Sequence, residues 1–195
     1  MVFINEESKE INCKVVYYGP PMCGKSTSLR YIVEQIGKKG NGEMLTLSND
    51  GDNTLYFDFI PIDLGKFKKH QLRLHLYTVP GEAAYKQARQ IISKGIDGVV
   101  FLADSSLEKL EENLSAMMEL KELVETEGGD FEKLPMVIQY NKRDLPNVVP
   151  LEELRRLLNP RKAPDFETVA TEGRGILEAL EAVSESVLRQ LREEG

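Results

Sequence analysis

The residues with the clearest chemistry are those at positions 19–26, which read Gly-Pro-Pro-Met-Cys-Gly-Lys-Ser and fit the pattern G-x-x-x-x-G-K-[ST]. Between an apolar strand and a helix, such a segment curls its backbone N–H groups around phosphate oxygens, and its lysine and serine reach phosphate and Mg²⁺. Here an apolar stretch at 11–18 precedes the segment and an amphipathic stretch follows it. The pattern predicts a nucleoside triphosphate site lined by Gly19, Pro20, Met22, Cys23, Gly24, Lys25, Ser26 and Thr27.

A second motif, Asn-Lys-Arg-Asp at 141–144, follows the apolar stretch 136–140 and indicates which base is bound. The carboxylate of Asp144 can accept hydrogen bonds from the ring N–H and the exocyclic amine of guanine. Adenine would leave it unpaired, which costs about 1–3 kcal/mol. We expect Asn141 to hold the loop or the other edge of the base, and the stem of Lys142 to pack on the ring. The alternative is a polar turn in which Asn141 and Asp144 cap the next helix.

The elements that must position these loops alternate along the chain, which is typical of a mostly parallel, doubly wound α/β sheet. Strands are predicted at 11–18, 55–62, 72–79, 98–103, 136–140 and 167–170, and apolar residues with helical spacing occur at 29–36, 107–117 and 176–191. The strands 55–62 and 72–79 are joined too closely for a crossover helix, so we expect a turn around Gly65 and an antiparallel pair. The glycine-containing segment 37–53 shows no period, which predicts a long loop.

Length and composition favour one domain over residues 1–195, with 41% hydrophobic and 29% charged residues. A net charge of -7 argues against binding to nucleic acid or to anionic membranes. The two cysteines do not form a disulfide framework and favour a reducing cytoplasm. We expect no direct membrane anchor, because no apolar stretch approaches about 20 residues and the sequence lacks a glycine after Met1 and a cysteine near its C-terminus.

The two motifs resemble those of the small Ras-like GTPases over essentially the whole chain. The resemblance implies a Ras-like P-loop G domain with one antiparallel strand in a mostly parallel sheet, and GTP/GDP and Mg²⁺ as ligands. Ala170-Thr171 is similar to the family's third base-contacting loop, in which a backbone N–H meets the guanine carbonyl; the alternative is a plain strand end. Thr54 resembles the switch I threonine that senses the γ-phosphate and Mg²⁺; the alternative is a β-branched residue that begins a strand.

One departure narrows the subfamily, because most Ras-like proteins have D-x-x-G where this chain has Thr-Val-Pro-Gly at 78–81. With Tyr-Tyr-Gly-Pro at 17–20 and Asn-Lys-Arg-Asp-Leu-Pro at 141–146, this resembles the MglA group of bacterial and archaeal cell-polarity GTPases. The resemblance implies an MglB-like roadblock-fold activating protein, effector proteins, and recruitment to a cell pole. To replace the missing aspartate, Asp58 is favoured over Asp104, so the expected metal ligands are Ser26, Thr54 and Asp58.

The positions that promote hydrolysis are changed, because the MglA group has arginine and glutamine where this chain has Asn53 and Glu82. Asn53 cannot neutralise charge on the γ-phosphate. An ionised Glu82 about 5 Å from that phosphate is repelled by roughly 3 kcal/mol at an effective dielectric near 20. Pro21 also lacks a backbone N–H for the phosphates.

We therefore predict GTP binding with slow intrinsic hydrolysis, in which Lys25, Thr54, Gly81 and Glu82 are the candidate catalytic residues. The alternative is a nearly non-hydrolysing GTP-binding scaffold. A nucleotide kinase is disfavoured, because the sequence shows no arginine-rich lid. Cys23 has two interpretations: Lys25 and neighbouring N–H groups could lower the pKa of its thiol, or it is a small residue that fills the loop.

Overall fold

The fold is that of a computed structural model of the chain, which describes residues 3–5, 9–37, 45–47, 57–67, 69–79, 92 and 94–194. Within these residues, eight strands form one sheet with the order β3-β4-β5-β2-β6-β7-β8, and β1 pairs with β2. The strands are β1 (Phe3–Asn5), β2 (Glu10–Tyr18), β3 (Leu45–Leu47), β4 (Phe57–Phe67), β5 (His70–Thr78), β6 (Gly98–Asp104), β7 (Met136–Asn141) and β8 (Asp165–Glu167). The helices are α1 (Lys25–Gly37), a short 3-10 helix (Leu107–Lys109), α3 (Leu110–Thr126), α4 (Leu151–Leu158) and α5 (Ile176–Glu194).

Parallel pairing dominates the centre of the sheet. β2 pairs parallel to both β5 and β6, β6 to β7, and β7 to β8. The antiparallel β4–β5 pair is the one expected from the short connection. β1 and β3 add two further antiparallel pairs, with β2 and β4 respectively. The predicted α/β class is confirmed, because strands and helices alternate and the parallel strands β2, β6, β7 and β8 end at the same edge.

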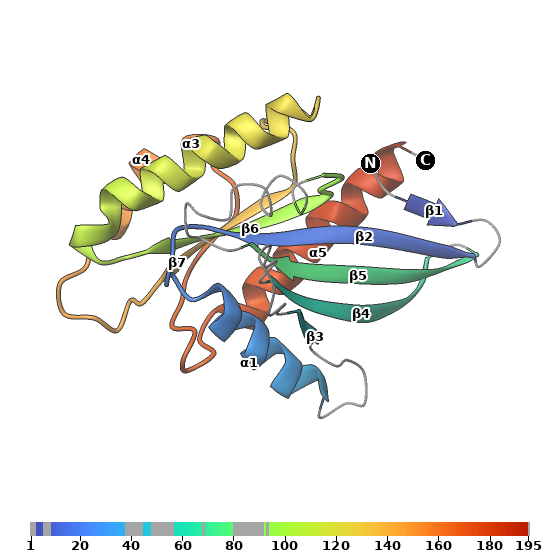
Figure 1. Cartoon of the computed structure of the whole chain (residues 1–195), viewed down its shortest axis with the longest axis horizontal. Coiled ribbons are helices and arrows are strands. Elements are labelled where there is room, and N and C mark those ends of the chain that lie inside the picture. Colours follow the sequence, from blue (N-terminus) through green and yellow to red (C-terminus); the bar gives the residue numbers. More distant parts are fainter. Residues whose placement is uncertain are drawn as a thin grey trace.

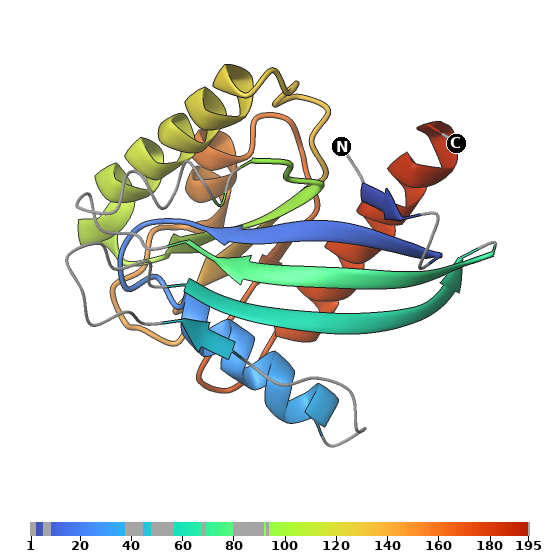
Figure 2. The same cartoon turned by 45° about the vertical axis from the view of Figure 1, so that its right-hand side comes forward.

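Helices cover both faces of the sheet (Figures 1 and 2). On one face, α1 and α5 pack on β2, β4 and β5 through a buried cluster that includes Leu29, Ile60, Leu74 and Val183. On the other face, α3 and α4 pack on β6 and β7 through a second cluster that includes Phe101, Leu120, Ile138 and Leu154. All residues of β6 and β7 are buried, as expected for central strands with helices on both faces.

Five details of the predicted elements were wrong or missing, one of them the unpredicted strand β1. Gly65 lies inside β4 with φ +85, at a register shift between Asp63 and Gly65, and the hairpin closes where Phe67 pairs with His70. A bulge of this kind needs the left-handed conformation that glycine supplies. The last strand ends at Glu167 rather than continuing to residue 170, β3 interrupts the expected long loop, and α4 was not predicted.

His75 of β5 gives the fold a pH dependence. Its Nε2 lies 2.9 Å from Oδ1 of Asn12, and the ring centroid of Phe59 lies 5.4 Å from its own. Burial and the charge of Arg73 lower the pKa of His75 from 6.5, against the opposing charge of Glu10. The unfolded chain therefore takes up a proton that the folded chain resists, so this stability is present above about pH 6.5 and is lost as the pH falls through the lower folded pKa.

We expect the midpoint of thermal unfolding to fall between pH 7.5 and pH 5.5, and the variant His75→Gln to show a smaller fall. Thermal unfolding of both proteins, followed by circular dichroism across this range, measures the difference. His70, at the start of β5, provides the matched control variant His70→Gln. Equal pH dependence in His75→Gln and the wild type would contradict the assignment.

Candidate functional site

The predicted site residues of the described chain gather at one edge of the sheet. The loop 19–24 follows β2, Asp104 ends β6, the loop after Asn141 follows β7, and residues 168–171 follow β8. These four strands are parallel, so their carboxyl ends lie together. In the sheet order, β2 lies between β5 on one side and β6 on the other. The order of the strands reverses there, and ligands of open α/β sheets bind at such a switch point.

Two glycines shape the loop after β2. Gly19 has φ +149, and a Cβ there would lie 2.2 Å from the backbone oxygen of Leu102. Gly24 has φ +108, and a Cβ there would lie 2.2 Å from Nδ2 of Asn141. Only glycine fits at both positions, since any side chain would displace a neighbouring strand or the side chain of Asn141. The loop thus has the close backbone approach expected of a phosphate cradle.

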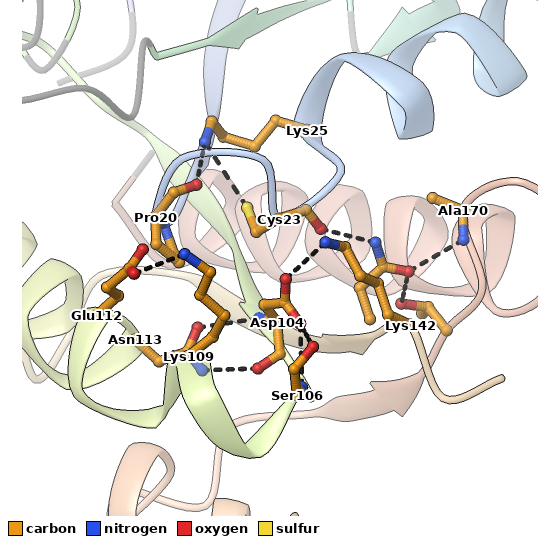
Figure 3. A network of polar contacts seen from close by, with 12 residues as sticks. Pro20, Cys23, Lys25, Asp104, Ser106, Lys109, Glu112, Asn113, Lys142 and Ala170 are labelled. Carbon is orange, nitrogen blue, oxygen red and sulfur yellow. Dashed lines mark hydrogen bonds and ion pairs between the residues drawn. The ribbon is translucent and has the colours of Figure 1, made fainter. Parts of the chain in front are cut away.

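Lys25 places its charge inside this cradle. Its Nζ donates to the backbone oxygen of Gly19 at 2.9 Å and to that of Pro20 at 2.7 Å, and Figure 3 shows the second of these bonds. Only 8% of the residue is exposed. Ser26 and Thr27 follow it, half-buried, in the first turn of α1, which carries no acidic residue. The loop therefore combines an ammonium group with the positive end of a helix, an arrangement that attracts phosphate.

The rest of the loop separates into an exposed and a buried residue. Met22 is 84% exposed and adopts a left-handed φ of +59. Cys23 is fully buried, and its Sγ lies 3.6 Å from Nζ of Lys25. Burial raises the pKa of the Cys23 thiol, and the nearby Lys25 opposes this only in part. Of the two interpretations of Cys23, the structure supports the loop filler, because a buried thiol with a raised pKa is unreactive.

Asn141 ties three loops together through one side chain. Its Nδ2 donates to the backbone oxygen of Cys23 at 2.7 Å, and its Oδ1 accepts from the backbone N–H of Ala170 at 3.0 Å and from Oγ1 of Thr168 at 3.2 Å. Asn141 is only 2% exposed, so these bonds satisfy a buried amide. It does not cap the next helix, because Pro150 occupies the N-cap of α4. Of the two roles expected for Asn141, the structure supports holding the loop.

The N–H of Ala170 is thus donated to Asn141, whereas the resemblance implies that a backbone N–H of the Ala170-Thr171 loop meets the guanine carbonyl. The loop that follows is constrained on its other side by α1. A Cβ at Gly173 would lie 1.9 Å from the ring of Tyr31, and Gly173 has φ +76. Residues 168–173 therefore have fixed contacts with both the loop after β7 and helix α1.

Lys142 and Asp144 differ in exposure. The Nζ of Lys142 lies 2.6 Å from Oδ2 of Asp104, and its backbone is left-handed with φ +65, which costs an L-residue about 1–2 kcal/mol. Asp144 is exposed and therefore accessible to a base. Between them, Arg143 bonds Oε2 of Glu167 at 3.0 Å and the backbone oxygen of Val149 at 2.8 Å. These contacts fix both flanks of the loop while leaving the carboxylate of Asp144 in solvent.

Several predicted residues lie outside the described residues, namely Asn53, Thr54, Gly81 and Glu82. Of Asp58, the structure describes only the backbone, which pairs with Thr46 across β4 and β3. Asp104, the other metal candidate, instead accepts hydrogen bonds from Lys142 and Ser106. In the part of the chain that the structure describes, no three His, Cys, Asp or Glu residues form a group that could hold a metal ion.

Sequence reasoning missed how Asp104, Asn113 and Thr168 contribute to this edge. Asp104 pairs in register with Asn141, since both end neighbouring parallel strands. That adjacency was a usable signal, because each residue closes a strand next to a predicted loop. For Asn113 and Thr168 the sequence offers no such signal, because a buried polar residue in a helix or loop has no sequence pattern of its own.

None of the described helices is both long enough and apolar enough to cross a bilayer.

Comparison with known proteins identifies relatives over nearly the whole chain. A sequence model of the ADP-ribosylation factor family matches residues 3–187. The mutual gliding-motility protein MglA of Myxococcus xanthus is 48% identical over 195 residues, covering all of both chains. The human ADP-ribosylation factor-like protein 4A is 26% identical over 183 residues, covering 90% of this chain and 84% of its own. The pea Ras-related protein Rab7 is 25% identical over 186 residues, covering 93% and 84%.

Proposed function

Because the chain belongs to the ADP-ribosylation factor family and is an MglA-type small GTPase, we propose that it is a GTP-binding switch that controls motility or cell polarity. The observation that carries this proposal is the side chain of Asn141, which joins the phosphate loop to both base loops. That contact brings the phosphate motif and the guanine motif into one site. The motility role is supported by the name of the Myxococcus xanthus relative.

Each predicted nucleotide-binding residue that the structure describes is assigned a role in this proposal. The loop 19–24 surrounds the phosphates, Lys25 adds its positive charge, and Asp144 accepts from the guanine edge. The stem of Lys142 covers the ring, and the guanine carbonyl shares the N–H of Ala170 with Asn141, with Thr171 completing that loop. The close approach at Gly19 and Gly24 supports this assignment, because it lets the loop pack tightly against Leu102 of β6 and against Asn141, as a compact phosphate cradle does.

Mg²⁺ neutralises phosphate charge when bound and is assigned to Ser26, Thr54 and Asp58. The half-buried Ser26 provides the hydroxyl that follows the loop lysine in such sites. Mg²⁺ takes few protein ligands besides phosphate and water, so two hydroxyls and one carboxylate suit it. In the switch, Thr54 and Gly81 report the γ-phosphate, and their rearrangement after hydrolysis is what a partner reads.

Intrinsic hydrolysis is slow in this proposal, because Asn53 and Glu82 replace the arginine and glutamine of the MglA group. We expect the double variant Asn53→Arg with Glu82→Gln to hydrolyse GTP at least about tenfold faster, since an arginine on the γ-phosphate contributes about 10³–10⁵-fold in related enzymes. A single-turnover assay on purified protein measures both rates. The exposed Glu111 of α3 gives the matched control Glu111→Gln, which should leave the rate unchanged. Equal rates in the double variant and the wild type would show that these positions are not catalytic here.

A nearly non-hydrolysing scaffold is the second candidate, and the changed residues Pro21, Asn53 and Glu82 favour it. The nucleotide that copurifies distinguishes the two: a switch converts bound GTP to GDP with time, and a scaffold retains GTP. A roadblock-fold partner similar to MglB would then be added, because an activating protein can supply the missing charge in trans. Faster turnover in the mixture supports the switch. The proposed switch is cytoplasmic, and by resemblance partners recruit it to a pole where effectors read its state.

A further inference from the structure

A buried carboxylate stands beside the guanine-recognition loop without belonging to it. Asp104 ends β6, and only 1% of its side chain is exposed. Its Oδ2 accepts from Nζ of Lys142 at 2.6 Å, and its Oδ1 accepts from the N–H of Ser106 at 3.0 Å and from the Ser106 hydroxyl at 2.5 Å (Figure 3). A carboxylate removed from water is strongly unfavourable unless it is paired in this way. Asp104 is therefore committed to its protein partners.

Helix α3 fixes the backbone of the same residue. The side chain of Asn113 accepts from the N–H of Asp104 at 2.9 Å and donates to its backbone oxygen at 2.7 Å. Asn113 is fully buried, so both of its polar groups are used in this contact. Figure 3 shows Asp104 between Asn113 on one side and Lys142 on the other. A continuous line of polar contacts thus runs from α3 to the loop after β7.

The other end of this line is a lysine in an unusual conformation. Lys142 has φ +65, a backbone conformation that residues other than glycine rarely adopt. Its backbone oxygen accepts from the N–H of Leu145 at 3.2 Å. Such an outlier persists only where its surroundings impose it, and it is typical of functional sites. Here the backbone turn fixes one end of the Lys142 side chain and Asp104 holds the other. The apolar stem between them has little freedom to move.

We infer that Asp104 is a positioning residue for the nucleotide: it holds the ammonium of Lys142 so that the stem lies where the guanine ring packs, and Asn113 anchors this arrangement to α3. The inference rests on the proposed function, which assigns the Lys142 stem to the guanine ring. Burial alone would raise the pKa of Asp104. The hydrogen bonds from Lys142 and Ser106 and the charge of Lys142 outweigh this effect and hold the pKa below its ordinary value. The carboxylate is therefore ionised at neutral pH, as the ion pair requires.

The dissociation rate of N-methylanthraniloyl-GDP tests the inference on the full chain. We expect Asp104→Asn, which keeps the shape and removes the charge, to release this probe about tenfold faster, because a charge-assisted bond is lost. Asp104→Glu should recover part of the loss. Asp97 is the matched control, since it is a buried carboxylate just before β6 that accepts from the N–H of Lys14 at 2.8 Å. Asp97→Asn should leave the release rate unchanged.

A second background separates positioning from a general structural effect. Lys142→Met keeps the apolar stem and removes the ammonium, so Asp104→Asn should add nothing to the release rate in this variant. A tenfold acceleration in both backgrounds would mean that Asp104 acts through the fold and would overturn the inference. An unchanged rate in the Asp104→Asn single variant would also overturn it.

Hydrogen exchange in the nucleotide-free protein tests the role of Asp104 separately from the proposed function. If the wild type binds no guanine nucleotide, the proposed function is wrong, and exchange at the N–H groups of Arg143 and Leu145 decides the inference. These groups donate to Thr168 and Lys142 at 3.2 Å each. Faster exchange in Asp104→Asn but not in Asp97→Asn supports positioning of this loop, and unchanged exchange overturns it.

Discussion

Replacing Asp144 by asparagine is expected to transfer the nucleotide preference from guanine to xanthine. The carboxylate accepts from two neighbouring donors of guanine, whereas an amide offers one acceptor and one donor. Xanthine has a carbonyl in place of the exocyclic amine, so it matches the amide. Each mismatched pair costs about 1–3 kcal/mol, so we expect the ratio of GDP to XDP affinities to change by at least about 100-fold. Asp144 is exposed, and its loop is held by contacts of Asn141, Lys142 and Arg143, so the fold should tolerate the change.

Competition of GDP and XDP against N-methylanthraniloyl-GDP measures this preference. Asp130 supplies the control Asp130→Asn, because it is an exposed aspartate between α3 and β7. It precedes β7, whereas Asp144 follows this strand, so the two lie near opposite ends of it. The control should retain the preference for GDP. A variant Asp144→Asn that still prefers GDP would show that the loop after β7 does not read the base, and the guanine assignment would then be wrong.

The second large effect is expected for Gly19→Ala. The new Cβ would lie 2.2 Å from the backbone oxygen of Leu102, and φ is +149. Because the obstacle is the backbone of a central strand, either β6 or the loop must move. Overpacking of about 1–3 kcal/mol and left-handed strain of about 1–2 kcal/mol together predict a loss near 3 kcal/mol in the free energy of unfolding. For a chain of this size that is a fall of about 6–12 °C in the unfolding midpoint.

Nucleotide binding should be lost with it, since Lys25 bonds to the backbone oxygen of Gly19 itself. Gly95→Ala is the matched control: Gly95 has φ +67 and nothing within 4 Å of an added Cβ, so it carries the strain without the clash. We expect this control to lose about 2–8 °C, less than Gly19→Ala, and to keep full nucleotide affinity. Scanning calorimetry and titration with GDP check both proteins. Equal losses in the two variants would mean that the close approach to Leu102 is unimportant.

Local patterns were sufficient for most of the fold. The long apolar strands β2, β6 and β7 and the helices α1, α3 and α5 have clear periods, because each buries a face over several turns or residues. α4 was missed although Leu154 and Leu158 are buried on one face, since eight residues give a short pattern. β1 and β3 have three residues each and could not be found in this way.

Residues around the site were harder to predict, because apolar residues of a buried site loop have the same sequence pattern as the end of a buried strand. Val169 and Ala170 are apolar, so the sequence predicted that the last strand includes them. In the structure both are buried but belong to the loop after β8. The environment of Cys23 also required the structure, because the lysine two residues away and the burial of the thiol act on its pKa in opposite directions. The pairing of Asp104 with Lys142 joins the last residue of β6 to the residue that follows β7, and it can be inferred only once the register of these two strands is known.

The side chain of Asn141 has a consequence for when the site can form during synthesis. Its bond to Cys23 joins residues 118 apart in the chain, and its bond to Ala170 joins residues 29 apart. Contacts of such long range form late, and a nascent chain grows from its N-terminus. The phosphate loop therefore leaves the ribosome long before the residues that hold it. Until residue 170 emerges, the growing chain has no complete site, so stabilisation by bound nucleotide begins only with the last segment.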